Sequence, residues 1–170
     1  MSQQESKPSA LAPSSPEILL RPLQSHDVKG VKEIELAWPL LSHWDIEVYY
    51  GVAAGRQNAQ GLVAVEKEGE GRERLVGFMV YRVTAPDTEI LNIAVDPACT
   101  RRQIGTQMLH HLEIRVRREG VENIFLEVRP SNQPARDFYI KERFREVGRR
   151  RDYYSNPTED AILMKWELGT

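Results

Sequence analysis

Residues 95 to 109, VDPACTRRQIGTQML, have the composition of a turn that binds phosphate. An apolar strand ends at Pro97, two arginines follow, and a helix begins near Gly105. The first turn of a helix has unpaired N–H groups and partial positive charge, which suit an anion. Arg101 and Arg102 would strengthen that attraction, and Gly105 would let backbone approach a ligand closely. An ordinary strand–turn–helix connection with two solvated arginines fits these residues as well, so both interpretations stay open.

Of three polar residues further along, a glutamate and a tyrosine have side chains that could serve an acid–base reaction. Glu127 lies in the apolar run FLEVR, and Tyr139 lies on a short segment that follows Asn132. Each also has a structural explanation: a strand glutamate facing solvent, a tyrosine packed in the core beside Phe138, and an asparagine capping a helix.

Metal and thiol chemistry are disfavoured. His110 and His111 are adjacent on a predicted helix and point about 100° apart, so they form no two-ligand face, and no metal is expected. Cys99 has no histidine placed by the sequence to activate it, so we expect no nucleophilic role.

Composition narrows the class of protein. The chain has 170 residues, a formal net charge of −2 and a single cysteine. The charge argues against general nucleic-acid binding, which usually shows a strong basic excess. The sequence has no apolar run of about 18 residues and no signal-peptide pattern, so neither a membrane partner nor export is expected. A soluble cytoplasmic protein, either a monomer or a weak dimer, is the expectation.

The elements that would position these residues form one domain. Residues 1–16 are rich in Ser, Pro and Gln and predict a disordered tail, so a single domain should span 17–170. Apolar periodicity predicts strands and helices in the order β, α, α, β, β, β, α, β, α, β, β, hence a mixed sheet with helices on its faces. Strands joined through a helix should lie parallel. The predicted strands cover 17–23, 61–69, 74–83, 87–97, 122–130, 145–155 and 159–168, and the predicted helices cover 25–38, 39–53, about 105–119 and 132–144.

A family resemblance rests on several motifs together. LNIAVDPACTRRQIGTQML, residues 91–109, resembles the signature of the GCN5-related N-acetyltransferases (GNAT). LEVRPSNQPARDFY and the later VGRRRDYYSNPTEDAILMKWEL resemble the RimI-type ribosomal-protein alanine N-acetyltransferases. The resemblance covers about 18–168 and is strong from Leu91 onward. It implies the GNAT fold, of the α/β (α+β) class, with a mostly antiparallel sheet of about six to seven strands and helices on both faces.

The resemblance also implies a cofactor and a set of residues that bind it. The turn would hold the pyrophosphate of acetyl-coenzyme A (acetyl-CoA) through the backbone of residues 101–106. Thr100 and Gln103 depart from the family pattern, and Gln103 replaces a glycine. A positive φ at Gln103 would cost about 1–2 kcal/mol relative to glycine. The implied cofactor-binding residues are Ile93, Ala94, Val95, Arg101, Arg102, Gln103, Ile104, Gly105, Thr106 and Asn132, with the oxyanion donor among the N–H groups of residues 93–95.

The implied reaction is direct acetyl transfer to an amine. Glu127 would be the general base and Tyr139 the general acid to the sulfur. Tyr153 and Tyr154 would contact the acceptor, which by resemblance is a protein N-terminus, with the alanine of small-subunit ribosomal protein eighteen as the best guess. Trp38, Pro39 and Trp44 would lie at the acceptor groove. A lysine side chain, a small-molecule amine and a non-catalytic CoA-binding module remain as alternatives.

Overall fold

The protein contains a seven-stranded sheet with the strand order β1-β2-β3-β4-β5-β7-β6. The coordinates are a computed structural model that describes residues 16–169, so the predicted tail lies outside the described residues except for Pro16. The strands are β1 (Ile18–Pro22), β2 (Gln60–Glu68), β3 (Arg72–Thr84), β4 (Asp87–Val95), β5 (Asn123–Val128), β6 (Arg145–Tyr154) and β7 (Glu159–Glu167).

Four α-helices and short 3-10 turns connect the strands. The helices are α1 (Val28–Leu36), α2 (Ile46–Ala53), α3 (Ile104–Arg117) and α4 (Gln133–Lys141). The helix predicted over 39–53 begins only at Ile46, because the Asp45 carboxylate accepts a hydrogen bond from Glu47 N at 3.0 Å and so caps α2. Among the described residues, no helix is long and apolar enough to cross a bilayer.

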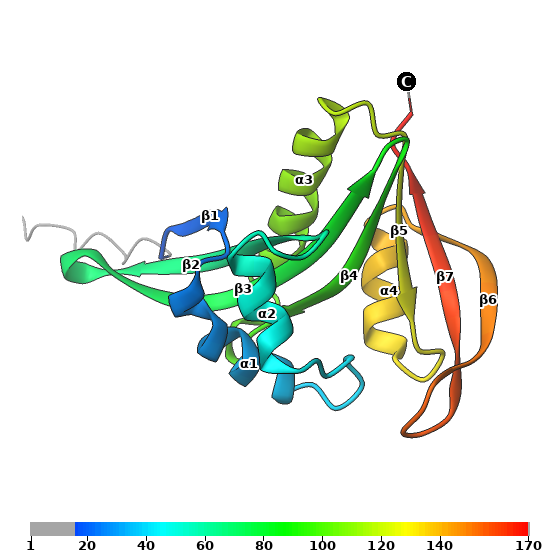
Figure 1. The fold of residues 1–170 in the computed structure, drawn as a ribbon, viewed down its shortest axis with the longest axis horizontal. Coiled ribbons are helices and arrows are strands. Elements are labelled where there is room, and N and C mark those ends of the chain that lie inside the picture. Colours follow the sequence, from blue (N-terminus) through cyan, green and yellow to red (C-terminus); the bar gives the residue numbers. More distant parts are fainter. Residues whose placement is uncertain (1–15, 170) are drawn as a thin grey trace, which may run out of the picture.

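The helices cover both faces of the sheet, as predicted (Figure 1). Helices α1 and α2 pack on one face, where Val28, Val31 and Tyr49 join Phe78 and Val80 in one buried cluster. Helix α3 packs on the opposite face, where its apolar side and α4 meet a second cluster. That cluster includes Met108, Leu109, Leu112, Ile124, Leu126, Tyr139, Met164 and Trp166.

The sheet opens between β4 and β5. These strands are parallel, as predicted, but only residues Asp87–Ile90 of β4 pair with residues Asn123–Leu126 of β5. Beyond Ile90, β4 stays paired with β3 up to Val95, and β5 stays paired with β7 up to Val128. Figure 1 shows the two strands diverging from their shared end. Backbone groups on the facing edges of this opening are therefore free of sheet hydrogen bonds.

A bulge in β4 marks the opening. Val80 of β3 lies opposite Asn92 and Tyr81 lies opposite Ile90, so Leu91 is the extra residue. Ile90 consequently packs on the α3 face, whereas Asn92 turns to the other face and donates to the Tyr49 hydroxyl at 2.9 Å.

Candidate active site

A cleft of about 840 Å³ occupies the opening between β4 and β5. Its walls come from the loop after α1, the end of β4, the turn before α3, the end of β5 and helix α4. The structure brings together most of the residues singled out in the sequence. Those that line the cleft are Trp38, Pro39, Ile93, Ala94, Val95, Cys99, Thr100, Arg101, Gln103, Ile104, Gly105, Thr106, Glu127, Asn132, Tyr139 and Tyr154.

The turn before α3 has a backbone that suits an anion. Arg101 has φ 67° and Gln103 has φ 58°, while Arg102 between them is outside the left-handed region. This alternation directs successive N–H groups toward one concave side, next to the positive end of α3. Each left-handed residue costs about 1–2 kcal/mol because neither is glycine. The positive φ considered for Gln103 is therefore present.

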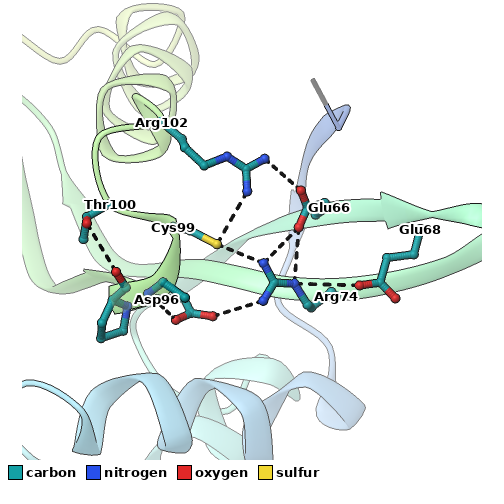
Figure 2. A network of polar contacts seen from close by, with 9 residues as sticks. Glu66, Glu68, Arg74, Asp96, Cys99, Thr100 and Arg102 are labelled. Carbon is teal, nitrogen blue, oxygen red and sulfur yellow. Dashed lines mark hydrogen bonds and ion pairs between the residues drawn. The ribbon is translucent and has the colours of Figure 1, made fainter. Parts of the chain in front are cut away.

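Arg102 differs from its expected role as an attractor of anions. Its side chain does not line the cleft; its Nη2 donates to Glu66 Oε1 at 2.8 Å, and its Nη1 lies 3.6 Å from Cys99 Sγ (Figure 2). The Arg102 guanidinium is thus paired with Glu66, so the backbone of Arg102 is the part of this residue that faces the turn. Cys99 is 1% exposed and contacts Arg74 Nη2 at 3.0 Å, so it is a packed residue of this network.

Gly105 lines the cleft and also lies against α4. A Cβ on Gly105 would lie 2.9 Å from Cζ of Phe138 on α4. The glycine therefore allows α4, the helix that carries Tyr139, to pack against the first turn of α3.

Glu127 is enclosed at the end of β5. Its side chain is 9% exposed, and its Oε1 lies 2.7 Å from Arg150 Nε on β6. A solvent-facing strand glutamate is therefore excluded. Glu127, followed by burial, raises the pKa of the nearby Tyr153 phenol to about 12. Tyr153 itself is 49% exposed and lies outside the cleft lining.

The phenols of Tyr139 and Tyr154 lie on the cleft wall. Burial raises the pKa of Tyr139 above its ordinary value, so this group is neutral across the physiological range. Burial, followed by Glu127, also raises the pKa of Tyr154. The Arg129 guanidinium stacks 4.1 Å from the centre of the Tyr154 ring, which fixes that ring in the cleft.

Asn132 both caps α4 and lines the cleft. Its Oδ1 accepts from Ala135 N at 3.3 Å and so caps α4, and the residue also lines the cleft. Nearby, the Thr106 hydroxyl donates to Glu142 Oε1 at 2.5 Å. This contact links the first turn of α3 to the end of α4.

The loop after α1 forms the wall opposite β5. Trp38 and Pro39 line the cleft, and Trp38 Nε1 donates to the Val95 carbonyl at 2.8 Å. Trp44 does not line it, contrary to expectation, because it stacks on Tyr49 with ring centres 5.4 Å apart. Asn92 holds the loop to β4 by donating to the Ser42 carbonyl at 3.1 Å.

Three acidic residues that could meet a basic acceptor peptide, Glu47, Asp87 and Glu89, do not form one group. Asp87 and Glu89 line a second cavity of about 330 Å³ next to Arg150. Glu47 is exposed on α2 and lines neither cavity.

Arg150, Arg129 and Glu142 were not singled out in the sequence. The contact of Arg150 with Glu127 spans β7, which lies between β5 and β6. Sequence order suggested that β6 and β7 are neighbours but gave no sign that β7 inserts beside β5. For Arg129, its position two residues after Glu127 was the available signal, because alternate residues of a strand share a face.

The chain belongs to the acetyltransferase (GNAT) family, whose pattern matches residues 26–144. Within it, the chain resembles a narrower group. It is 38% identical over 94 residues to the ribosomal protein bS18-alanine N-acetyltransferase of Salmonella typhimurium, a match that spans 54% of this chain and 64% of that protein. A Bacillus subtilis protein provisionally named for the same activity is 30% identical over 145 residues, or 85% of this chain and 92% of that protein.

A crystal structure supports the same fold. The ribosomal-protein-S18-alanine N-acetyltransferase from Escherichia coli superimposes with a TM-score of 0.72 at 26% identity, covering 91% of this chain and 96% of that chain. The predicted fold class is confirmed.

Proposed function

We propose that this protein is an acetyl-CoA-dependent N-acetyltransferase that modifies the α-amino group of a protein N-terminus. The observation that carries the proposal is the cleft itself. It unites an anion-binding turn, an enclosed carboxylate and a buried phenol at the point where β4 and β5 separate.

The cleft fits a coenzyme A molecule. The turn at 101–106 offers backbone N–H groups to the pyrophosphate, next to the N-terminus of α3. The apolar residues Ile93, Ala94 and Val95 line the path from this turn toward Glu127. Asn132 lines the same path and would contact the pantetheine arm.

Three groups of the chain would carry out the transfer. Glu127 accepts a proton from the attacking amine as the new C–N bond forms at the thioester carbon. Free N–H groups of β4 beyond Ile90 stabilise the charge on the carbonyl oxygen. Tyr139 gives its proton to the departing sulfur as the C–S bond breaks. Its phenolate then recovers a proton from solvent, and Glu127 releases one.

An α-amino acceptor suits this arrangement. Its pKa of about 7.7–8.0 leaves a large neutral fraction, so one carboxylate is a sufficient base. The relatives named for bS18-alanine transfer favour the N-terminal alanine of ribosomal protein bS18 as the acceptor. Tyr154 and the exposed Tyr153 would contact the acceptor chain. A ribosomal acceptor would place the enzyme in the cytoplasm.

Two peptides test the acceptor class. One has a free N-terminal Ala-Arg and no lysine; the other has a blocked N-terminus and internal lysines. Intact-mass analysis with acetyl-CoA is expected to show one added acetyl group on the first peptide alone. Acetylation of the second peptide alone would replace this proposal with lysine transfer. If neither peptide gains mass, titration with coenzyme A separates an enzyme with another acceptor, which binds it, from a chain that has lost the cofactor.

A further inference from the structure

A buried carboxylate, Glu66, ties the turn before α3 to the β2–β3 hairpin. Glu66 Oε1 accepts from Arg102 Nη2 at 2.8 Å, and Oε2 accepts from Arg74 Nη2 at 3.0 Å and Nε at 3.2 Å. The Glu66 side chain is only 8% exposed. Figure 2 shows both guanidinium groups converging on this carboxylate from different elements.

The same cluster also holds the beginning of the turn. Arg74 lies directly opposite Glu66 on the neighbouring strand, and its Nη1 is 3.6 Å from Asp96 Oδ2. Asp96 in turn accepts from Ala98 N at 2.9 Å through its other oxygen. Both ends of the segment 96–103 are therefore anchored to the sheet by one group of ion pairs.

Arg102 occupies the position where an anchor has most effect on the backbone. It lies between Arg101 and Gln103, the two residues with positive φ. Non-glycine residues keep such conformations only where the surrounding structure over-determines them. Fixing the Arg102 side chain restricts the peptide units on both of its sides. The ion pair with Glu66 can thus stabilise the positive φ of Gln103, a conformation that glycine at position 103 would adopt without strain.

We propose that Glu66 is a positioning residue for coenzyme A binding. It holds Arg102, with the help of Arg74, so that the turn keeps the left-handed residues that direct its N–H groups toward the pyrophosphate. The inference rests on one part of the proposed function, the binding of coenzyme A. It does not depend on the identity of the acceptor. A phosphate ligand role for the Arg102 side chain makes the opposite prediction, because Glu66 would then compete with the phosphate.

Calorimetric titration with coenzyme A alone tests the inference. Glu66→Gln and Arg102→Gln should each weaken binding by about five- to tenfold. The double variant should bind no more weakly than the weaker single variant, because both changes remove the same interaction. Glu68→Gln is the matched control: Glu68 Oε1 is 3.8 Å from Arg74 Nε and its side chain is 52% exposed, so binding should change by less than about twofold.

A second substitution separates positioning from general loss of structure. Gln103→Gly in the Glu66→Gln background should recover most of the lost affinity, since glycine adopts positive φ without strain. In steady-state assays, Glu66→Gln should raise KM for acetyl-CoA while kcat at saturation stays within about twofold. Three results would each overturn the inference. They are unchanged or tighter binding by Glu66→Gln, no recovery of affinity with Gln103→Gly, and a native protein that does not bind coenzyme A. A failed peptide test with these binding results intact would reject only the acceptor.

Discussion

At the scale of single residues, Glu127 and Tyr139 have complementary environments. Glu127 is enclosed but contacts a guanidinium, so its charge has a partner. Tyr139 is buried, and burial raises its pKa, so it remains protonated and keeps a proton to give to the sulfur as the C–S bond breaks. Acetylation of an amine calls for a group that accepts the amine proton and is helped by one that protonates the departing sulfur.

Tyr139→Phe tests the proposed acid. Removing the hydroxyl should lower kcat by about tenfold or more, because the sulfur then leaves without a proton donor. Coenzyme A affinity and melting temperature should hardly change, since the ring and its packing remain. The control is Tyr81→Phe, which removes another buried phenol hydroxyl on β3, outside the cleft, and should leave kcat unaltered. Equal kcat values in the two variants would remove Tyr139 from the mechanism.

The residue motifs predicted much of the site but not its ion pairs. The Ser-Asn turn and the glycine-containing turn identified Asn132 and the segment 101–106, all of which line the cleft except Arg102. The direction of Arg102 depends on Glu66, which is 36 positions away in the sequence. No local pattern contains that information, so the sequence indicated only that the Arg102 charge would strengthen the attraction of an anion.

At the scale of elements, the packing of α4 on α3 places Tyr139 and the turn before α3 in one cleft. Gly105 at the start of α3 faces the Phe138 ring at a distance that leaves no room for a Cβ. Phe138 precedes Tyr139 on α4, so a shift of this ring would also move the proposed acid.

Gly105→Ala tests this contact. The added methyl group should displace α4 and lower the free energy of unfolding by about 1–3 kcal/mol, as overpacking usually does. It should also weaken coenzyme A binding, measured by calorimetry beside urea denaturation. Phe138→Leu in the same background should recover part of the stability by removing the ring edge. If Gly105→Ala alone is as stable as the native protein, the close contact does not constrain α4.

The order of elements was predictable, and their pairing only partly so. Alternating and helical periodicities identified the strands and helices, and the β4–α3–β5 unit is parallel as the connection required. The bulge at Leu91 and the early end of the β4–β5 pairing leave no mark in the apolar pattern. Both features depend on how the helices pack on the two faces of the assembled sheet.

At the scale of the whole molecule, ion pairs give the fold a defined response to acid. The pKa of Glu66 is lowered by Arg102 and then by Arg74, and that of Glu167 by Lys165 and then by Arg145. A carboxyl whose pKa is lowered on folding stabilises the protein above its unfolded value of about 4.3. That contribution is lost as the pH falls through the lower, folded pKa.

Urea denaturation between about pH 7 and pH 3 should therefore show the free energy of unfolding falling mainly below about pH 4.5. The Glu66→Gln variant lacks one of these titrating groups. Its stability should differ most from that of the native protein near neutral pH, and the difference should shrink in acid. A difference that stays constant over this range would mean that Glu66 contributes no charge-dependent stability.

The most direct test of the central claim, acetyl transfer in the cleft with Glu127 as base, is the kcat of Glu127→Gln with the Ala-Arg peptide. A fall of about tenfold or more is expected at saturating acetyl-CoA, with the affinity for coenzyme A nearly unchanged. Glu122→Gln, at an exposed position just before β5, serves as the control and should match the native enzyme. A native kcat in Glu127→Gln would show that Glu127 is not the base.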